Sequence, residues 1–389
     1  EGLSPEIRTQ ISQYNDLSTN KPAVDWQSQI FHLPIQELLT SMGEPEATFE
    51  EFVKRSPASE GWFDGGLYHD NEKWGVPGLW FNSWYDVSIG PNMALANHAR
   101  TNGIDAEVRE NQYVVVGPNN HCQFASLGPD FTSGDRDLGD TSFDTDGLVY
   151  AWFDKWLKGK NIAFDQETPH NQYYTMGANK WQGDDEWPPK AAKNVRLYLH
   201  SNTNANSLFG DGYANFEEPT EDGEDSYYYD PMIPVKTIGG GDCCNGGIVT
   251  AGSFDQRTIE ARNDVLVYTT DPLEEPIEGT GFVDAVLHVS SDAKDTDFAV
   301  KLVDVAPDGT AYIIDDTIFR TRYREGYSKQ VMMKEGEIYK LDMTPMTTSI
   351  EFQKGHSIRI EITSSNFPKF VRNLNTGGNN YDESKGVIA

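Results

Sequence analysis

The chain has 389 residues and carries 61 Asp and Glu against 31 Lys and Arg, which leaves a net charge of −30. A surface this acidic repels the phosphates of nucleic acid, which excludes a nucleic-acid partner and favours a well-solvated protein. One hydrophobic core rarely grows beyond about 250 residues, so the length predicts two or three domains. No apolar run approaches the roughly 18 residues of a membrane helix, and no membrane partner is expected. No targeting segment is recognisable, so the compartment stays open.

Residues 1–75 are predicted to be helical. Apolar residues recur every three or four positions over residues 31–39 and 49–53. Thr48 and Glu51 have the spacing of a capping box, which predicts that a helix starts there. The aromatic residues of this segment suit either a small core or a lid over a cleft. They include Trp26, Phe31 and Trp62.

The pattern changes at residue 76, and residues 76–192 predict alternating strands and helices. Continuous apolar runs over residues 77–82 and 113–117 are typical of strands buried on both faces. A helix is predicted between them over residues 92–99, and another over residues 147–157 that ends near Gly159. This alternation is typical of an α/β domain with a parallel sheet.

Residues 193–389 lose the alternation and predict an all-β domain. Short strands are separated by turn formers such as Pro307-Asp308-Gly309, which is typical of a β-sandwich or jelly roll. The strands are predicted over residues 195–199, 264–268, 282–289, 299–305 and 357–362. Asp292, Asp295 and Asp297 could bind calcium, but they lack the EF-hand spacing and are predicted to be solvated loop carboxylates.

Two residues that could carry chemistry follow neighbouring strands of the predicted sheet. Asp86 comes after the first strand and His121 after the second. In open α/β sheets, ligands bind beyond the carboxyl ends of the strands. An Asp and a His in this order match the last two members of a Ser–Asp–His triad, in which His moves the proton and Asp orients the ring. A structural turn Asp and a surface His remain the alternative.

The nucleophile of such a triad is missing from its expected motif. An α/β-hydrolase places its serine in Gly-x-Ser-x-Gly, upstream of the acid and the base. No serine of this chain stands in that motif.

Three groups of residues resemble the CocE/NonD hydrolases, a family that includes cocaine esterases, α-amino acid ester hydrolases and X-Pro dipeptidyl-peptidases. The first group is Trp84-Tyr85-Asp86 with Gly117-Pro118-Asn119-Asn120-His121, and the second is the aromatic helix over residues 151–159. The third comprises Asp295-Thr296-Asp297-Phe298, Arg322-Tyr323-Arg324-Glu325, residues 364–370, Arg372-Asn373 and residues 375–378. The resemblance begins near Trp74 and extends more loosely over the helical part. It implies a partial α/β-hydrolase sheet with a helical cap, followed by a C-terminal jelly-roll β-sandwich.

The resemblance implies that Asp86 is the triad acid and His121 the triad base. The family's serine and its oxyanion tyrosine would both precede residue 1, so the chain would correspond to the C-terminal two-thirds of such an enzyme. Cocaine esterase has a Phe lining its acyl pocket where this chain has Ser88. Residues 81–84 offer no carboxylate to hold an α-ammonium group, which favours a neutral acyl substrate.

The resulting hypothesis is a serine hydrolase that cleaves acyl esters or amides through an acyl-enzyme. This chain would supply Asp and His, an upstream segment would supply Ser, and the isolated chain would be inactive. The candidates to line the acyl pocket are Trp84, Trp26, Phe31 and Trp62. The alternative is a non-catalytic β-sandwich binding module attached to a remnant hydrolase half. A homo-oligomer is left open.

The three cysteines, Cys122, Cys243 and Cys244, are too few for a disulfide scaffold or a cysteine-rich zinc site. The histidines show no spacing typical of metal ligands, so no metal and no other cofactor is predicted. Cys243 and Cys244 could close a vicinal disulfide, but the Cα atoms of adjacent residues lie only about 3.8 Å apart, below the usual disulfide range. Two thiols in a glycine-rich turn are therefore favoured.

The hypothesis also predicts a geometry. Asp86 should accept a hydrogen bond from Nδ1 of His121, at roughly 2.6–3.2 Å between heavy atoms. Asp86 should be largely buried and supported by backbone N–H groups of the turn that follows Tyr85.

Overall fold

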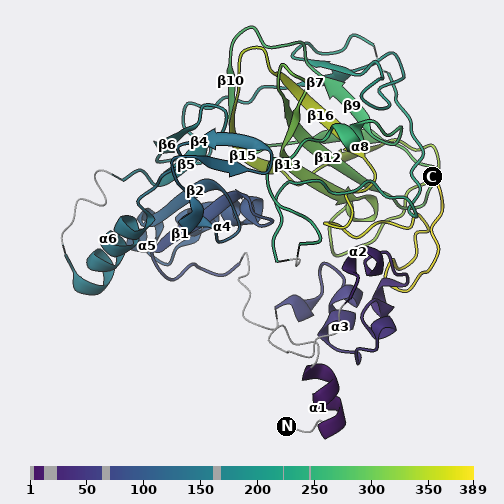
Figure 1. Ribbon diagram of the computed structural model, residues 1–389, viewed down its shortest axis with the longest axis horizontal. Helices are drawn as coiled ribbons and strands as arrows, with labels where there is room; N and C mark the ends of the chain where they lie inside the picture. The colour runs from purple at the N-terminus through teal and green to yellow at the C-terminus, as the bar shows by residue number, and fades with distance from the viewer. Residues whose placement is uncertain (1–3, 13–23, 64–70, 161–167, 222, 245–246) are drawn as a thin grey trace.

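The computed structural model describes residues 4–12, 24–63, 71–160, 168–221, 223–244 and 247–389 (Figure 1). A helical N-terminal segment comes first, then a small sheet flanked by helices, then a large region of antiparallel strands. The predicted mixture of α/β and β structure is confirmed. Among the described residues, no helix has the length and the apolar character needed to cross a membrane.

The N-terminal segment is helical as predicted, but its helices are short. The helix expected over residues 31–39 is wrong, because Pro34 is extended, with φ −68° and ψ 147°, and only a 3₁₀ turn follows it. Proline lacks an N–H group and disfavours helical backbone at the preceding residue. The elements of the segment are α1 (Pro5–Ser12), α2 (Trp26–Gln29), the 3₁₀ turns Ile35–Glu37 and Thr40–Met42, α3 (Thr48–Lys54) and the 3₁₀ turn Glu60–Trp62.

The predicted start of α3 is confirmed, but its capping interaction involves a different residue. Ala47 precedes the helix, and its backbone N–H donates to Oε2 of Glu50 at 2.7 Å. The capping carboxylate is therefore that of Glu50, where Glu51 was predicted.

A four-stranded sheet follows, in the order β1-β2-β5-β6. Its first three strands are parallel, and the fourth is antiparallel to its neighbour. The predicted strands and both predicted helices are confirmed, whereas β5 and β6 were not predicted because their sequences contain many polar residues. The bounds are β1 (Gly78–Tyr85), α4 (Ile89–Asn102), α5 (Ala106–Glu110), β2 (Gln112–Asn120), the 3₁₀ turn Phe124–Ser126, the hairpin β3 (Phe131–Ser133) and β4 (Arg136–Gly139), α6 (Thr145–Lys158), β5 (Asn171–Thr175) and β6 (Lys180–Asp184).

The elements from β7 onward form what we call the β region. Its largest sheet has the strand order β13-β12-β16-β9-β8-β7, and two-stranded ladders join β10 to β15 and β11 to β14. The predicted strands are present with shifted ends, and the run over residues 282–289 is broken into two strands. The bounds are β7 (Tyr198–His200), β8 (Tyr213–Asn215), α8 (Arg257–Glu260), β9 (Leu266–Thr269), β10 (Ile277–Val283), β11 (Val286–Val289), β12 (Asp297–Val305), β13 (Ala311–Arg320), the 3₁₀ turn Thr321–Tyr323, β14 (Tyr339–Asp342), β15 (Met346–Phe352) and β16 (Ser357–Thr363).

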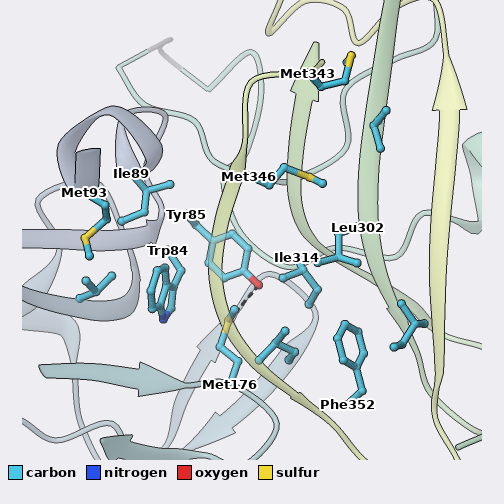
Figure 2. Packing of buried hydrophobic residues seen from close by; sticks show 14 of the residues in the cluster. Trp84, Tyr85, Ile89, Met93, Met176, Leu302, Ile314, Met343, Met346 and Phe352 are labelled. Carbon is cyan, nitrogen blue, oxygen red and sulfur yellow. Dashed lines mark hydrogen bonds between the residues drawn. The ribbon is translucent and has the colours of Figure 1, made fainter. Parts of the chain in front are cut away.

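One continuous hydrophobic core joins the small sheet to the β region. Figure 2 shows Tyr85 of β1 reaching toward Ile314 of β13, while Met176 lies beside the tyrosine ring. The hydroxyl of Tyr85 lies 3.4 Å from the sulfur of Met176. The backbone of Met176 continues this junction by pairing with Ile350 of β15. The end of β1 is therefore fixed against the β region by its contacts with β13 and with Met176, which pairs with β15.

A buried polar network connects three of the motifs that carry the family resemblance. Asp295 accepts from Nε of Arg322 at 2.7 Å and from Nδ2 of Asn373 at 2.6 Å. Asp297 receives both Nε and Nη2 of Arg320, at 2.9 and 2.8 Å. The prediction of solvated loop carboxylates is therefore wrong for Asp295 and Asp297, whose charges are buried against arginines. It is confirmed for Asp292, which is exposed.

Candidate active site

The parallel register of β1 and β2 places Asp86 next to His121. Tyr85, the last residue of β1, is paired with Asn120, the last residue of β2. Asp86 and His121 follow these two residues directly and are therefore neighbours. The register shifts between Ser83 and Tyr85, which offsets the strand ends by one residue. Both side chains therefore lie at the carboxyl edge of the sheet, where open α/β sheets place their ligands.

Asp86 and His121 form a short hydrogen bond. Nδ1 of His121 lies 2.6 Å from Oδ2 of Asp86, within the predicted range. Because a carboxylate can only accept, Nδ1 is the donor of this bond, and in a neutral imidazole the lone pair is then on Nε2. The Asp86 side chain is 9% exposed and that of His121 is 39% exposed. The acid is thus buried, while the imidazole still reaches solvent.

Ser88 satisfies the second oxygen of the acid. Its backbone N–H and its hydroxyl donate to Oδ1 of Asp86, at 3.0 and 2.9 Å. The Ser88 hydroxyl in turn accepts from Nδ2 of Asn92 at 3.0 Å. These bonds offset the cost of burying a carboxylate and hold it in one orientation. Sequence reasoning treated Ser88 only as the replacement of a pocket residue, although a Ser two residues after an Asp is a known Asx-turn pattern.

Two further Asp–His pairs occur in the described residues, and neither has the same properties. The ring of His170 is bonded on both sides, to Asp185 at 3.1 Å and to the carbonyl of Glu110 at 2.9 Å. His356 lies 2.8 Å from Asp304. Asp304 is already bound to an arginine, at 2.6 Å from the guanidinium of Arg136. Among the Asp–His pairs of the described residues, the pair at the edge of the parallel sheet therefore combines a buried acid that has no arginine partner with an imidazole whose Nε2 makes no hydrogen bond.

A hollow lies beside His121, and a loop of the β region forms one of its walls. The loop approaches closely because Gly241 has no side chain: a Cβ there would lie 2.7 Å from the carbonyl oxygen of Asp86. The backbone N–H of Asp242 is 3.3 Å from the carbonyl oxygen of Tyr85. Residues lining the hollow include Asn120, His121, Gln123, Asp242, Cys243 and Cys244.

The two adjacent cysteines are free thiols in the structure. A hydrogen bond with Cys244 and partial burial raise the pKa of Cys243 to about 11. Cys243 is therefore a neutral thiol at physiological pH, which makes it a poor nucleophile. Sequence reasoning singled out this pair for its chemistry but had no means of placing it beside His121.

The prediction that Trp84 lines the acyl pocket is wrong. Its side chain is 1% exposed and belongs to the core shared with the β region. Its indole N–H donates to the carbonyl of Tyr174 at 2.7 Å, and its ring packs against Trp187. Trp84 therefore supports the sheet beneath the site.

The aromatic residues of the N-terminal segment have partners outside the site. Phe31 packs against Phe367 with ring centroids 4.9 Å apart, and its carbonyl accepts from Arg372. In Figure 1 the neighbouring helix α2 accordingly lies near the C-terminal stretch of the chain. Trp62 packs against Phe52 at 5.6 Å. Trp26 is partly buried. A role of these three residues in an acyl pocket stays a prediction.

The C-terminal part of the chain is similar to a known protein family. The family described as the X-Pro dipeptidyl-peptidase C-terminal non-catalytic domain matches residues 163–387. Asp86 and His121 lie outside this match, whereas Cys243 and Cys244 lie inside it.

Cocaine esterase of Rhodococcus sp. (strain MB1 Bresler) is 34% identical over 333 residues, which cover 85% of this chain and 55% of that protein. An aminopeptidase structure from a marine sediment archaeon, Thaumarchaeota archaeon, has a TM-score of 0.63 and 26% identity, and covers 79% of this chain and 50% of its own. An α-amino acid ester hydrolase structure has a TM-score of 0.61 and 26% identity, and covers 77% and 50%. The chain spans about half the length of these relatives. The chain belongs to the family of the X-Pro dipeptidyl-peptidase C-terminal non-catalytic domain, and it is a homologue of cocaine esterase.

Proposed function

We propose that this chain carries the acid and the base of a serine hydrolase that cleaves acyl esters or amides. Asp86 is the acid, His121 is the base, and the nucleophilic serine comes from a segment outside these 389 residues. The 2.6 Å contact between Nδ1 of His121 and Oδ2 of Asp86 is the observation that carries the proposal.

The chemistry follows from the state of the imidazole. Nε2 of His121 accepts the proton of the serine hydroxyl as the oxygen attacks the acyl carbon. It then returns this proton to the leaving alcohol or amine. Asp86 holds the ring in the required tautomer and stabilises the imidazolium while it exists. Water repeats the two steps and releases the acid product.

The architecture supports a missing upstream part. We interpret β1, β2 and β5 as the C-terminal half of an α/β-hydrolase sheet, residues 1–75 as its cap, and residues 193–389 as a jelly roll. Within the described residues β1 pairs only with β2, so one edge of the sheet is open. On α6, the side chains of Tyr150, Phe153 and Leu157 are 72%, 47% and 75% exposed. We propose that the upstream segment pairs with β1 and covers this apolar face.

The runner-up is a non-catalytic module, which the name of the C-terminal family favours for residues 163–387. Such a module has no need of a buried carboxylate bonded to a solvent-accessible imidazole. Labelling of a serine separates the two functions.

The substrate is proposed to be a neutral ester or amide. Residues 81–84, at the end of β1, offer no carboxylate to hold an α-ammonium group. Asp242 lines the hollow, and its carboxylate would favour an α-amino substrate. One of its oxygens, however, already accepts from the backbone of Cys243 at 2.7 Å. We expect a higher kcat/KM for p-nitrophenyl butyrate than for an α-amino acid ester. The reverse order, lost in Asp242→Asn, would assign the α-amino class.

The decisive experiment labels the full gene product with a fluorophosphonate probe. We expect one labelled serine, outside residues 1–389, and a labelling rate that falls by about 10⁴ in His121→Gln. His170→Gln is the matched control, because it removes the imidazole of another Asp–His pair. Equal labelling of His121→Gln and His170→Gln, or no labelled serine, would contradict the proposal.

A further inference from the structure

Three ligands suited to a soft metal ion meet in the hollow beside His121. His121, Cys243 and Cys244 each offer one ligand atom, and these atoms all lie within 4.8 Å of one another. One imidazole nitrogen and two sulfurs form a donor set typical of zinc and of the softer divalent ions. The triad chemistry proposed above has no use for the two sulfurs.

The backbone holds the cysteines in this position. Gly240 pairs with Gly252, with N–H···O distances of 2.8 and 3.0 Å, and this pairing fixes the base of the loop. Gly241 then packs directly on the backbone of Asp86. The backbone N–H of Cys243 donates to the Asp242 carboxylate at 2.7 Å, which fixes the backbone at the first cysteine. The cluster is therefore part of the contact between the β region and β1.

The Asp86–His121 pair is also the arrangement that metal sites use. A histidine ligand usually donates its second N–H to a carboxylate, which fixes the ring and raises the basicity of the coordinating nitrogen. Nδ1 of His121 is engaged in this way, so the coordinating atom is Nε2. The same hydrogen bond thus suits the orientation of a catalytic base and of a metal ligand.

We propose that His121, Cys243 and Cys244 bind one zinc-class divalent ion. Both thiols release a proton to solvent on binding, and the two thiolates balance the charge of the ion. Tetrahedral coordination with ordinary Zn–S bonds places the two sulfurs about 3.8 Å apart, and the ligand atoms of the unbound site already lie within 4.8 Å of one another. Cys244 is exposed, so the fourth position is open to water.

The consequence for catalysis rests on the proposed function, whereas the binding does not. A metal ion on Nε2 occupies the lone pair that would accept the serine proton. Binding therefore switches the hydrolase off, and a chelator restores it.

The test uses the reduced, metal-free chain. Titration with Cd²⁺ is followed by thiolate-to-cadmium absorption, and titration with Zn²⁺ by calorimetry. We expect one ion per chain and proton release on binding. Cys243→Ser/Cys244→Ser should abolish the absorption, and Asp86→Asn, which removes only the partner of the ligand, should weaken affinity by about tenfold.

Cys122→Ser is the matched control, because it removes the third cysteine, which follows His121 directly in sequence. It should leave the affinity unchanged. Equal loss in Cys122→Ser, unchanged affinity in His121→Gln, or no saturable binding would overturn the proposal.

A measurement on the unmodified chain guards against variants that fail to fold. Saturating Zn²⁺ should protect Cys243 and Cys244 from iodoacetamide while Cys122 stays reactive, as mass spectrometry of the peptides reports. Alkylation of all three cysteines at the same rates with and without zinc would overturn the site. In the full gene product, zinc should inhibit ester turnover by the wild type and not by the double serine variant. Zinc protection without any hydrolase activity would refute the proposed function and leave the metal site standing.

Discussion

The hydroxyl of Ser88 donates a 2.9 Å hydrogen bond to Oδ1 of Asp86, the oxygen that His121 leaves unused. The acid is therefore clamped between the base and the first turn after its own strand. This relationship makes Ser88 a positioning residue for the proposed pair, since it acts on the base only through Asp86.

Ser88→Ala should lower kcat of the complete enzyme by about three- to tenfold. The backbone N–H of residue 88 still supports the carboxylate, so only the hydroxyl bond to a charged group is lost. KM should change little, because Ser88 acts through Asp86. The control is Ser126→Ala, whose hydroxyl binds only a loop carbonyl. A change in KM alone would instead assign Ser88 to substrate binding.

Asp86→Asn should keep the fold and lower kcat of the complete enzyme by about 10⁴. The amide favours the wrong imidazole tautomer, in which Nε2 carries the proton and cannot accept one. Circular dichroism and steady-state ester hydrolysis check the two parts of the prediction. A kcat within a few-fold of wild type would remove Asp86 from the mechanism.

The isolated 389-residue chain should not turn over p-nitrophenyl acetate. The proposed nucleophile lies elsewhere, and Cys243 beside the base is held as a neutral thiol by its raised pKa. Turnover that iodoacetamide abolishes would show that a cysteine replaces the serine. Turnover that a fluorophosphonate abolishes would show that a serine of this chain attacks.

Asp295→Ala should destabilise the chain by about 3–5 kcal/mol. It leaves the buried Arg322 without its carboxylate, and an uncompensated buried charge is costly. Urea unfolding gives the free energy. The comparison is Lys334→Ala, which breaks an exposed ion pair with Glu337 and should have little effect. Equal midpoints for the two variants would show that the network contributes nothing to stability.

Asp315→Asn should change the pH dependence of stability. Burial, assisted by the charge of Asp316, raises the pKa of Asp315 from 3.8 to about 7. Between about pH 4 and about pH 7 the folded chain keeps a proton that the unfolded chain has lost, so this group's contribution to the free energy of unfolding falls as pH rises. The substituted asparagine cannot titrate, so the free energy of unfolding of the variant lacks this decrease. The stability of the variant relative to wild type should therefore rise between about pH 4 and about pH 7. Urea unfolding at several pH values measures the difference. A difference that is flat or declines with pH would contradict the assignment.

Much of the site could be predicted from sequence, because its central pair is set by local patterns. Asp86 and His121 each follow an apolar strand, and adjacent parallel strands bring their carboxyl ends together. Their contact therefore follows once the two strands are recognised. The support from Ser88 is equally local and could have been found from its spacing.

The remaining features depend on packing between distant segments. Nothing in residues 239–244 indicates that this loop docks on β1, since the contact joins parts of the chain more than 100 residues apart. The prediction for Trp84 was wrong because the sequence of a strand buried on both faces does not indicate which side chains reach a cleft. Asp295 and Asp297 were misplaced because their arginine partners come from elsewhere in the sequence.

The core that Tyr85 shares with Met176 and Ile314 is expected to make the small sheet and the β region melt as one cooperative unit. A side chain anchored in both sheets cannot be released by one of them alone, so calorimetry should record a single transition for both. Thermal inactivation of the acid–base pair would then coincide with loss of the C-terminal strands. A relative's C-terminal domain grafted onto this chain would need residues that pack against Tyr85 as Ile314 does. This holds even though that domain brings no catalytic group of its own.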